Sequence, residues 1–214
     1  MTDKTRFWNK IADNYAAKPV ANEAVYEKKL ALSQARMRSD MDLLEIGCGT
    51  GTTALRHASF VNKVFAVDFS SRMIEIAKEK AAKQNIENVE FICADISSDN
   101  KKHEIQAKEF DMVMAHSLLH LVPDRQAVLR QLYQQLKPGG IFISSTVCLS
   151  GAWSLLKPIW PICSALGIFP DVKFFKAARL VQDIQQAGFE IDYQWQNGPS
   201  LFVIALKAPQ PQTK

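Results

Sequence analysis

The chain has 214 residues, 47% of them hydrophobic, which is enough to bury a substantial core in what is most simply one domain. Its formal net charge of +4 comes from 26 basic and 22 acidic residues mixed along the length, with no stretch that interleaves Lys or Arg with aromatics, so nucleic-acid binding is not expected. No window of 18 uninterrupted apolar residues is present to span a membrane.

Cysteines stand at positions 48, 93, 148 and 163, too far apart for a C-x-x-C motif and each beside apolar or small neighbours. This spacing disfavours a zinc site and a disulfide framework. We therefore expect reduced thiols in a cytoplasmic protein, and no metal site.

Two helices are predicted ahead of the first strand. Apolar and aromatic side chains recur at helical spacing over residues 5–17, ahead of Pro19, and a second helix is expected over 22–37. In the first helix, Trp8 and Tyr15 could serve only to pack the helix against the rest of the chain.

The first strand leads into a glycine turn. The apolar run 43–46 breaks at Gly47, and glycines recur at Gly49 and Gly51 before a helix-compatible segment over 52–59. Glycine allows backbone angles and close approaches that a Cβ forbids, and the start of the following helix offers unpaired N–H groups. Such a turn suits an acceptor-rich ligand, although a turn that only joins strand to helix has the same pattern.

A carboxylate follows the second strand. Residues 64–67 form a short apolar run that ends at Asp68, so one strand-helix-strand unit returns this carboxylate to the edge of the glycine turn. A carboxylate there can accept both hydroxyls of a ribose. Asp68 could instead cap the next helix, but Ser70 is available as that cap, which favours the ribose role.

The third and fourth strands are expected over residues 89–94 and 110–115. Asp95 follows the third strand, and the fourth continues through His116 towards His120. Open α/β sheets bind ligands outside the carboxyl ends of their strands, so both histidines are site candidates. Either could instead be a histidine satisfied within a following helix.

The second half of the chain predicts two more helices and three strands. Asp124 is expected to cap a helix that Pro138-Gly139-Gly140 ends, before a fifth strand over 141–146. An amphipathic helix is predicted over 177–187, and Asn197-Gly198 predicts a hairpin turn between the last two strands.

Residues 147–175 form an apolar insertion rich in Trp, Leu, Ile and Phe, and its prolines exclude a single spanning helix. Two interpretations stay open. The insertion is either a helical cap packed on the sheet or an apolar wall for a lipid-like or aromatic molecule that also touches a membrane surface.

The run Glu45-x-Gly47-x-Gly49-x-Gly51 resembles the first motif of the class I S-adenosylmethionine-dependent methyltransferases. A dinucleotide fingerprint, G-x-G-x-x-G, would instead need glycine where Thr52 stands. The resemblance implies an α/β, Rossmann-like fold with a seven-stranded, mostly parallel sheet of order 3-2-1-4-5-7-6, helices on both faces and a terminal antiparallel hairpin. The run L-K-P-G-G-x-F-I, at 136–143, is similar to a second signature of the family.

The resemblance also implies the cofactor, S-adenosyl-L-methionine, with S-adenosyl-L-homocysteine as product. Family members bind the adenine amino group through an acidic residue after the third strand, which maps to Asp95, with Ile96 against the ring. A segment F-W-x-x-I-A-x-x-Y, here at 7–15, resembles their N-terminal lid. The cofactor-binding candidates are Trp8, Tyr15, Glu45, Gly47, Cys48, Gly49, Gly51, Thr52, Asp68, Phe69, Met73, Ala94, Asp95, Ile96, His116 and Ser117.

Catalytic candidates are fewer. His120 matches a position where related small-molecule methyltransferases present a histidine to the acceptor, which makes it a candidate general base. Tyr15 is the second candidate. A base is needed only if the acceptor is protonated at rest, since a sulfonium already makes its methyl carbon electrophilic.

The acceptor class follows from motifs that the sequence lacks. The segment A-H-S-L-L-H after the fourth strand has no [D/N/S]-P-P-[Y/F/W] tetrad, which amino-group methyltransferases carry, and no Pro-Cys nucleophile marks a cytosine C5 enzyme. We therefore expect a small, apolar, aromatic or lipid-like acceptor, as in the quinone and phospholipid biosynthesis members that the chain most resembles.

The expected organisation is a single methyltransferase domain over 1–214, with a helical lid at 1–38 and the apolar cap at 147–175. We expect a monomer or a homodimer. We expect no nucleic-acid partner, and at most a peripheral contact with a membrane. Two alternatives to a methyltransferase stay open: an NAD(P)-binding Rossmann oxidoreductase, and a protein that binds S-adenosylmethionine without transferring its methyl group.

Overall fold

The computed structural model describes residues 3–95, 105, 107–166 and 168–209. Their strands form one seven-stranded sheet of order β3-β2-β1-β4-β5-β7-β6, which confirms the predicted topology. By contact density the chain divides into two compact units, residues 1–103 and 104–214.

The first unit alternates helices with parallel strands. β1 pairs with β2, and β2 with β3, both in parallel register. Its elements are α1 (Asp3–Ala17), α2 (Glu23–Gln34), β1 (Asp42–Ile46), α3 (Thr52–His57), the 3₁₀ turn η1 (Ala58–Phe60), β2 (Lys63–Asp68), α4 (Ser71–Lys83) and β3 (Val89–Cys93).

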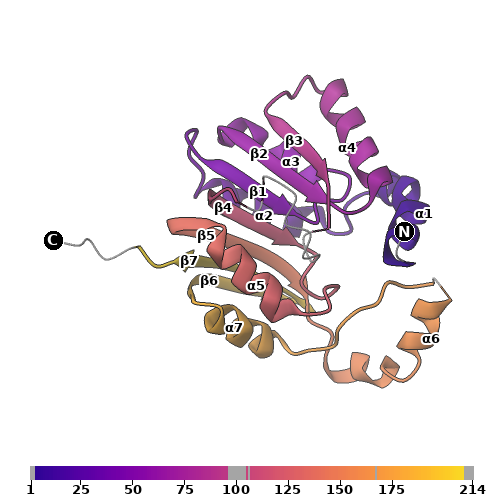
Figure 1. The fold of residues 1–214 in the computed structure, drawn as a ribbon. Coiled ribbons are helices and arrows are strands. Elements are labelled where there is room, and N and C mark those ends of the chain that lie inside the picture. Colours follow the sequence, from indigo (N-terminus) through magenta and orange to yellow (C-terminus); the bar gives the residue numbers. More distant parts are fainter. Residues whose placement is uncertain (1–2, 96–104, 106, 167, 210–214) are drawn as a thin grey trace. The chain divides into compact units, whose positions relative to one another are not determined.

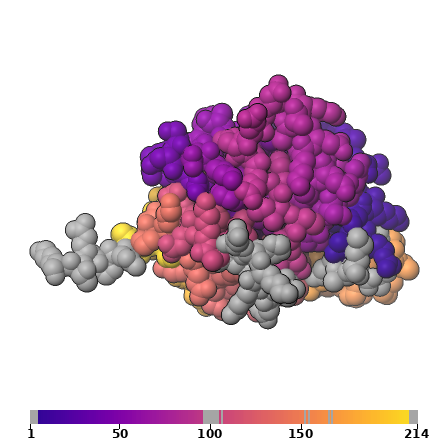
Figure 2. Space-filling model, turned by 45° about the horizontal axis from the view of Figure 1, so that its top comes forward, coloured from indigo at the N-terminus to yellow at the C-terminus, as the bar shows by residue number. Residues whose placement is uncertain are grey.

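Two helices of this unit lie against each other. α1 contacts α4 (Figures 1 and 2), where Ala12, Met73 and Ile76 form a buried cluster with Trp8 packed against it. β1 and β2 are almost continuously buried, as expected of parallel strands covered on both faces.

Gly51 shows why the turn after β1 needs glycine. Its φ is +73°, and a Cβ added there would lie 2.7 Å from Phe91 Cε1 and 2.8 Å from Ala77 Cβ. The α3 segment can therefore approach α4 and β3 only if residue 51 has no side chain.

The second unit carries the antiparallel part of the sheet. β4 pairs with β5 in parallel, whereas β7 pairs antiparallel with both β5 and β6. Its elements are β4 (Phe110–His116), α5 (Arg125–Gln134), β5 (Leu136–Val147), the 3₁₀ turn η3 (Gly151–Leu156), α6 (Trp160–Ala165), α7 (Ala177–Gln186), β6 (Phe189–Asn197) and β7 (Ser200–Lys207).

α5 and α7 lie side by side (Figure 1), held by an ion pair between Arg125 and the buried Asp183. Asp124 caps α5, because its carboxylate accepts the N–H of Ala127 at 2.9 Å, as predicted. Gly198 adopts a φ of +54° in the hairpin between β6 and β7, which confirms that turn.

The prediction that Pro138-Gly139-Gly140 ends the preceding helix was wrong. α5 already ends at Gln134, and β5 begins at Leu136, so these three residues lie inside the strand. There the pairing with β4 slips from Phe110–Leu136 to Met112–Ile141. The positive φ of Gly139, +75°, suits this irregularity. α2 is also shorter than expected, because it ends at Gln34.

Candidate functional site

The glycine turn is held by the end of β2. Gly47, Gly49 and Gly51 all have positive φ, between 54° and 73°. The N–H groups of Gly47 and Cys48 both donate to the carbonyl of Val67, at 2.8 and 3.1 Å. The turn therefore takes a left-handed backbone path that side chains would resist.

Asp68 fixes the middle of the same turn. Its Oδ2 accepts the N–H of Gly49 at 3.0 Å, and its Oδ1 accepts the N–H of Ser70 at 2.9 Å. Burial raises the pKa of Asp68 above its ordinary value, although these backbone hydrogen bonds oppose the shift. Ser70 caps α4 by accepting the N–H of Met73 at 3.2 Å, so the capping alternative for Asp68 was wrong.

Glu45 is a buried carboxyl beside this turn. Its exposed fraction is 2%, and its Oε2 has no hydrogen-bond partner in the part of the chain that the structure describes. Burial, and secondarily the charge of Asp68, raise the pKa of Glu45 to about 8. An unpaired carboxylate at such a position is costly, so the site is suited to a cationic hydrogen-bond donor that would pair with it.

Tyr15 brings α1 to the turn. A Cβ added to Gly49 would lie 3.9 Å from Tyr15 Cε1, so the phenol ring is within van der Waals distance of the loop. Half of the Tyr15 surface stays exposed to solvent. Burial of the phenol, and the charges of Asp68 and Glu45, raise the pKa of Tyr15. The hydroxyl is therefore protonated at neutral pH.

Trp8 and Met73 take part in packing. The Trp8 ring meets Tyr15 edge to face, with centroids 6.4 Å apart, and packs against the cluster that contains Met73. Met73 is only 2% exposed. A cofactor contact by either side chain stays a prediction.

The third strand brings its end beside that of β2. Asp68 pairs with Cys93, and the N–H of Ala94 donates to the Asp68 carbonyl at 3.0 Å. The exposed Asp95 and the preceding Ala94 therefore follow at the same edge of this unit. Ile96 lies outside the described residues.

A lysine near the turn was not predicted. Lys80 Nζ, on α4, donates to Thr50 Oγ1 at 2.9 Å and to Thr52 Oγ1 at 3.0 Å. Thr50 lies in the glycine turn and Thr52 is the first residue of α3, so Lys80 links the end of the turn to the start of the helix. The predicted residue Cys48 is buried, and burial holds its thiol pKa well above the ordinary value, so it is no nucleophile. Phe69, also predicted, is half-buried between Asp68 and Ser70.

The remaining candidates lie in the second unit. His116 ends β4, and Ser117 then takes a positive φ of 51° while its N–H donates to the Ser145 carbonyl at 2.7 Å. This left-handed residue is where the chain leaves the strand. A side-chain role for either in cofactor binding stays a prediction.

His120 follows in a turn, and no helix begins before Arg125. Its Nδ1 is buried without a partner among the described residues, and burial lowers its pKa to about 4. The imidazole is therefore neutral at neutral pH. Its carbonyl accepts the N–H of Lys173 at 2.8 Å, which ties the end of the apolar insertion to this turn.

These geometries can be set beside known proteins. The model of a family described as "Methyltransferase domain" matches residues 37–190, more than half of the chain. The chain belongs to this family. The chain resembles the malonyl-[acyl-carrier protein] O-methyltransferase of Priestia megaterium, with 31% identity over 195 residues, which cover 86% of this chain and 66% of that relative.

A second relative of the chain is the demethylmenaquinone methyltransferase of Leptospira interrogans, 36% identical over 110 residues that cover 50% of this chain and 43% of the relative. The chain thus spans between 43% and 66% of the length of these relatives. A putative methyltransferase from Bacillus halodurans shares the fold, with a TM-score of 0.68 and 16% identity over 85% of this chain and 99% of that one. The predicted family is confirmed, and a nicotinamide oxidoreductase is not favoured.

The family's cofactor, S-adenosylmethionine, fits the first unit of the chain. The molecule carries an ammonium, which suits the buried Oε2 of Glu45 that no described residue pairs with, and a ribose, which suits a carboxylate at the end of β2. A Cβ at Gly49 would meet no atom of the described residues within 4 Å except Tyr15 Cε1, so the backbone there leaves room for a ligand close to the chain.

Proposed function

We propose that the chain is an enzyme that transfers the methyl group of S-adenosylmethionine to a small, apolar, aromatic or lipid-like acceptor. The observation that carries this proposal is the presence of the buried Glu45 carboxyl, whose Oε2 has no partner among the described residues, beside a glycine turn that Asp68 holds in place. The relatives named above, an acyl-carrier-protein O-methyltransferase and a demethylmenaquinone methyltransferase, support it.

In this proposal the first unit holds the cofactor. Asp68 accepts the ribose hydroxyls, Asp95 accepts from the adenine amino group, and Glu45 pairs with the ammonium. The proposed contacts of this unit are completed by Gly47, Cys48, Gly49, Gly51, Thr52, Phe69, Met73, Ala94 and Ile96. For His116 and Ser117, which belong to the second unit, a cofactor contact is proposed from the family resemblance alone. The bound cofactor supplies a methyl carbon that its sulfonium makes electrophilic. Tyr15 and Trp8 exclude water from this carbon. Holding the acceptor in line with the carbon–sulfur bond lowers the reaction barrier by on the order of 7–11 kcal/mol in favourable cases.

We propose His120 as the base that removes the acceptor proton when the acceptor is a hydroxyl or a phenol. Its neutral imidazole, with Nδ1 unpartnered in the described part of the chain, supports this role. Tyr15 is a weaker base candidate, because its raised pKa keeps the phenol protonated. It can donate a hydrogen bond instead.

The insertion supports an apolar acceptor and contact with a membrane surface. Of the 11 exposed large hydrophobic residues in the described chain, 8 lie within 153–169, and we call them the apolar cap surface. Residues 147–170 contain no acidic residue, but they contain one basic residue, Lys157. Exposed Trp, Leu and Phe beside a lysine are typical of segments that rest in a membrane interface. None of the described helices is long and apolar enough to cross the bilayer.

The remaining parts of the proposal concern organisation. We propose a single methyltransferase domain over 1–214 with a lid at 1–38 and a cap at 147–175, acting as a monomer or homodimer. A cytoplasmic location is supported by the unpaired state of all four cysteines. Light scattering of the purified chain would give the oligomeric state.

The function is tested by methyl transfer. Radiolabelled S-adenosylmethionine is incubated with the chain and a panel of quinols, phenols and lipid head groups, with a peptide and an RNA as comparisons. We expect label only on members of the small-molecule panel. Label on the peptide or RNA alone would contradict the acceptor class, and cofactor binding without transfer to the panel or a cell extract would favour a non-catalytic binding protein.

A further inference from the structure

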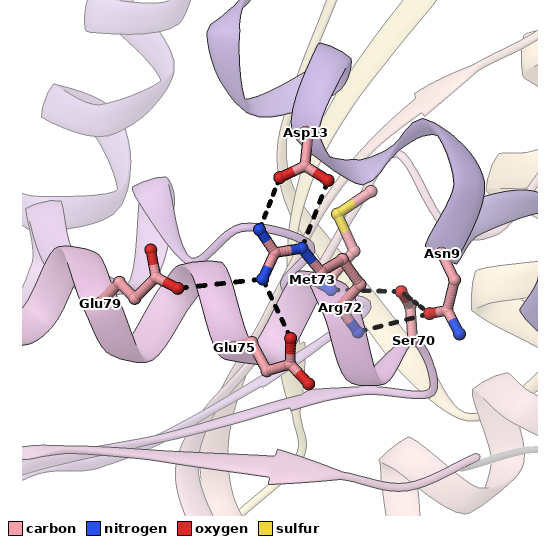
Figure 3. A network of polar contacts seen from close by, with 7 residues as sticks. All are labelled: Asn9, Asp13, Ser70, Arg72, Met73, Glu75 and Glu79. Atoms are coloured by element: carbon pink, nitrogen blue, oxygen red, sulfur yellow. Dashed lines mark hydrogen bonds and ion pairs between the residues drawn. The ribbon is translucent and has the colours of Figure 1, made fainter.

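A polar network joins the lid helix to the helix that follows Asp68. Arg72, at the start of α4, donates from Nη2 to Asp13 Oδ1 at 2.6 Å and from Nε to Asp13 Oδ2 at 3.3 Å. Its Nη1 also donates to Glu75 Oε2 at 3.0 Å. Figure 3 shows this guanidinium between α1 and the acidic side chains of α4.

Asn9 makes the inner part of the network. Its Oδ1 accepts the Ser70 hydroxyl at 2.6 Å and the backbone N–H of Arg72 at 3.3 Å (Figure 3). Ser70 is fully buried and is the cap of α4. Because its hydroxyl proton goes to Asn9, its oxygen lone pairs stay turned towards the N–H of Met73.

The network continues to the glycine turn. The N–H of Ser70 donates to Asp68 Oδ1 at 2.9 Å, and Asp68 Oδ2 accepts the N–H of Gly49 at 3.0 Å. Asn9 on the lid is therefore connected through two residues to the loop. α1 reaches the same loop a second time through the Tyr15 ring.

We propose that Asn9 is a positioning residue, which fixes the Asp68 carboxylate and the lid helix as one unit for cofactor binding. The inference rests on the proposed function, since Asp68 and Tyr15 act on the cofactor there. Asn9 orients Ser70, Ser70 orients the carboxylate, and the docked helix holds Tyr15 over Gly49.

The inner and outer contacts differ in strength. The Arg72–Asp13 pair is exposed, with 36% and 66% of the two side chains accessible, so salt screens it and its contribution is small. The Asn9–Ser70 hydrogen bond is partly buried and neutral, so salt affects it little. Loss of the Asn9–Ser70 hydrogen bond should therefore weaken cofactor binding, whereas loss of the Arg72–Asp13 ion pair should not.

The test uses the full chain and two substitutions of the same residue. Asn9→Leu has similar size without an acceptor, whereas Asn9→Asp keeps an oxygen at the start of α4. Asn14→Leu, at an exposed position on the same helix, is the matched control. Calorimetry with S-adenosylmethionine and hydrogen exchange of the Gly49 amide are measured for each.

For Asn9→Leu we expect cofactor Kd to rise about three- to tenfold, the effect of losing one neutral hydrogen bond. Gly49 amide exchange should accelerate, and kcat at saturating cofactor should change less than KM. Asn9→Asp should restore both readouts, and Asn14→Leu should match the wild type. The rise in Kd should persist at high salt.

Two failures are distinguishable. If the wild-type chain binds no S-adenosylmethionine, the proposed function falls. If the wild type binds and Asn9→Leu matches Asn14→Leu in Kd and Gly49 exchange, the positioning role of Asn9 is wrong while the function stands. A lowered melting temperature with unchanged Kd and exchange would likewise contradict it, because that pattern indicates a purely structural contact.

Discussion

Gly49 donates its backbone N–H to Asp68 Oδ2 at 3.0 Å, which ties the turn after β1 to the end of β2. The carboxylate that is proposed to bind the ribose thus also shapes the loop beside it. A single substitution at Asp68 would therefore affect the loop and the ligand together.

Gly51→Ala should destabilise the chain through backbone strain and overpacking. A left-handed backbone costs a non-glycine residue about 1–2 kcal/mol, and crowding in a packed core adds about 1–3 kcal/mol. Gly139→Ala is the matched control, because its φ of +75° is equally strained but a Cβ there would meet nothing within 4 Å. Urea unfolding should show the larger loss at Gly51, and equal losses would contradict the packing argument.

Glu45 should make the stability of the ligand-free chain fall with rising pH. Its folded pKa of about 8 lies above the ordinary 4.5, so the folded state binds the proton more tightly. The stabilisation is complete below about pH 4.5 and is lost as pH rises through 8, by up to about 5 kcal/mol.

Urea unfolding of the wild type and Glu45→Gln, at pH 5, 6.5 and 8, checks the Glu45 prediction. The amide cannot titrate, so the difference in unfolding free energy between the two proteins should shift towards the variant as pH rises. A difference that stays constant across this range would show that Glu45 is ionised at all three pH values.

His120→Gln should lower kcat for a hydroxyl or phenol acceptor by about 10²–10⁴-fold, the usual contribution of a general base. Steady-state kinetics at saturating cofactor checks this. Unchanged kcat with a protonated acceptor would remove His120 from the mechanism.

The same variant tests the burial of the imidazole. A folded pKa of about 4, below the ordinary 6.5, means that the unfolded chain binds the proton first, so His120 lowers stability as pH falls from 6.5 to 4. His120→Gln should therefore lose less stability than the wild type over that window.

The apolar cap surface should bind membranes. Leu155→Asp combined with Ile162→Asp should abolish co-sedimentation with vesicles that contain anionic lipid, because both side chains are exposed, by 80% and 61%. The control combines Val20→Asp and Phe60→Asp, which are exposed apolar residues outside the cap. Equal vesicle binding by both double variants, or none by the wild type, would contradict membrane contact.

The features that the sequence predicted correctly depend on residues close together in the chain. Ser70 and Asp124 cap their helices as expected, and the apolar runs that end at Ile46 and Val67 form buried strands, since these features arise within a few residues. Strand order followed from the family resemblance and not from local pattern.

The features that were not predicted depend on contacts between segments far apart in the sequence. The position of Pro138 inside β5 follows from how that strand slips against β4. The contacts of Lys80 with Thr50 and of Asn9 with Ser70 exist only because helices pack together, and no spacing in the sequence signals them.

Asp68 and the glycine turn are proposed to bind S-adenosylmethionine together. Calorimetric titration of the wild type, Asp68→Ala and the exposed control Asp40→Ala, with S-adenosylmethionine and with NADH, tests this proposal most directly. We predict one cofactor per chain, a Kd about 10- to 100-fold weaker in Asp68→Ala from the lost charged hydrogen bonds, an unchanged Kd in Asp40→Ala, and no heat with NADH. Absence of S-adenosylmethionine binding up to about 1 mM, which corresponds to about −4 kcal/mol, or equal binding by the wild type and Asp68→Ala, would contradict the account.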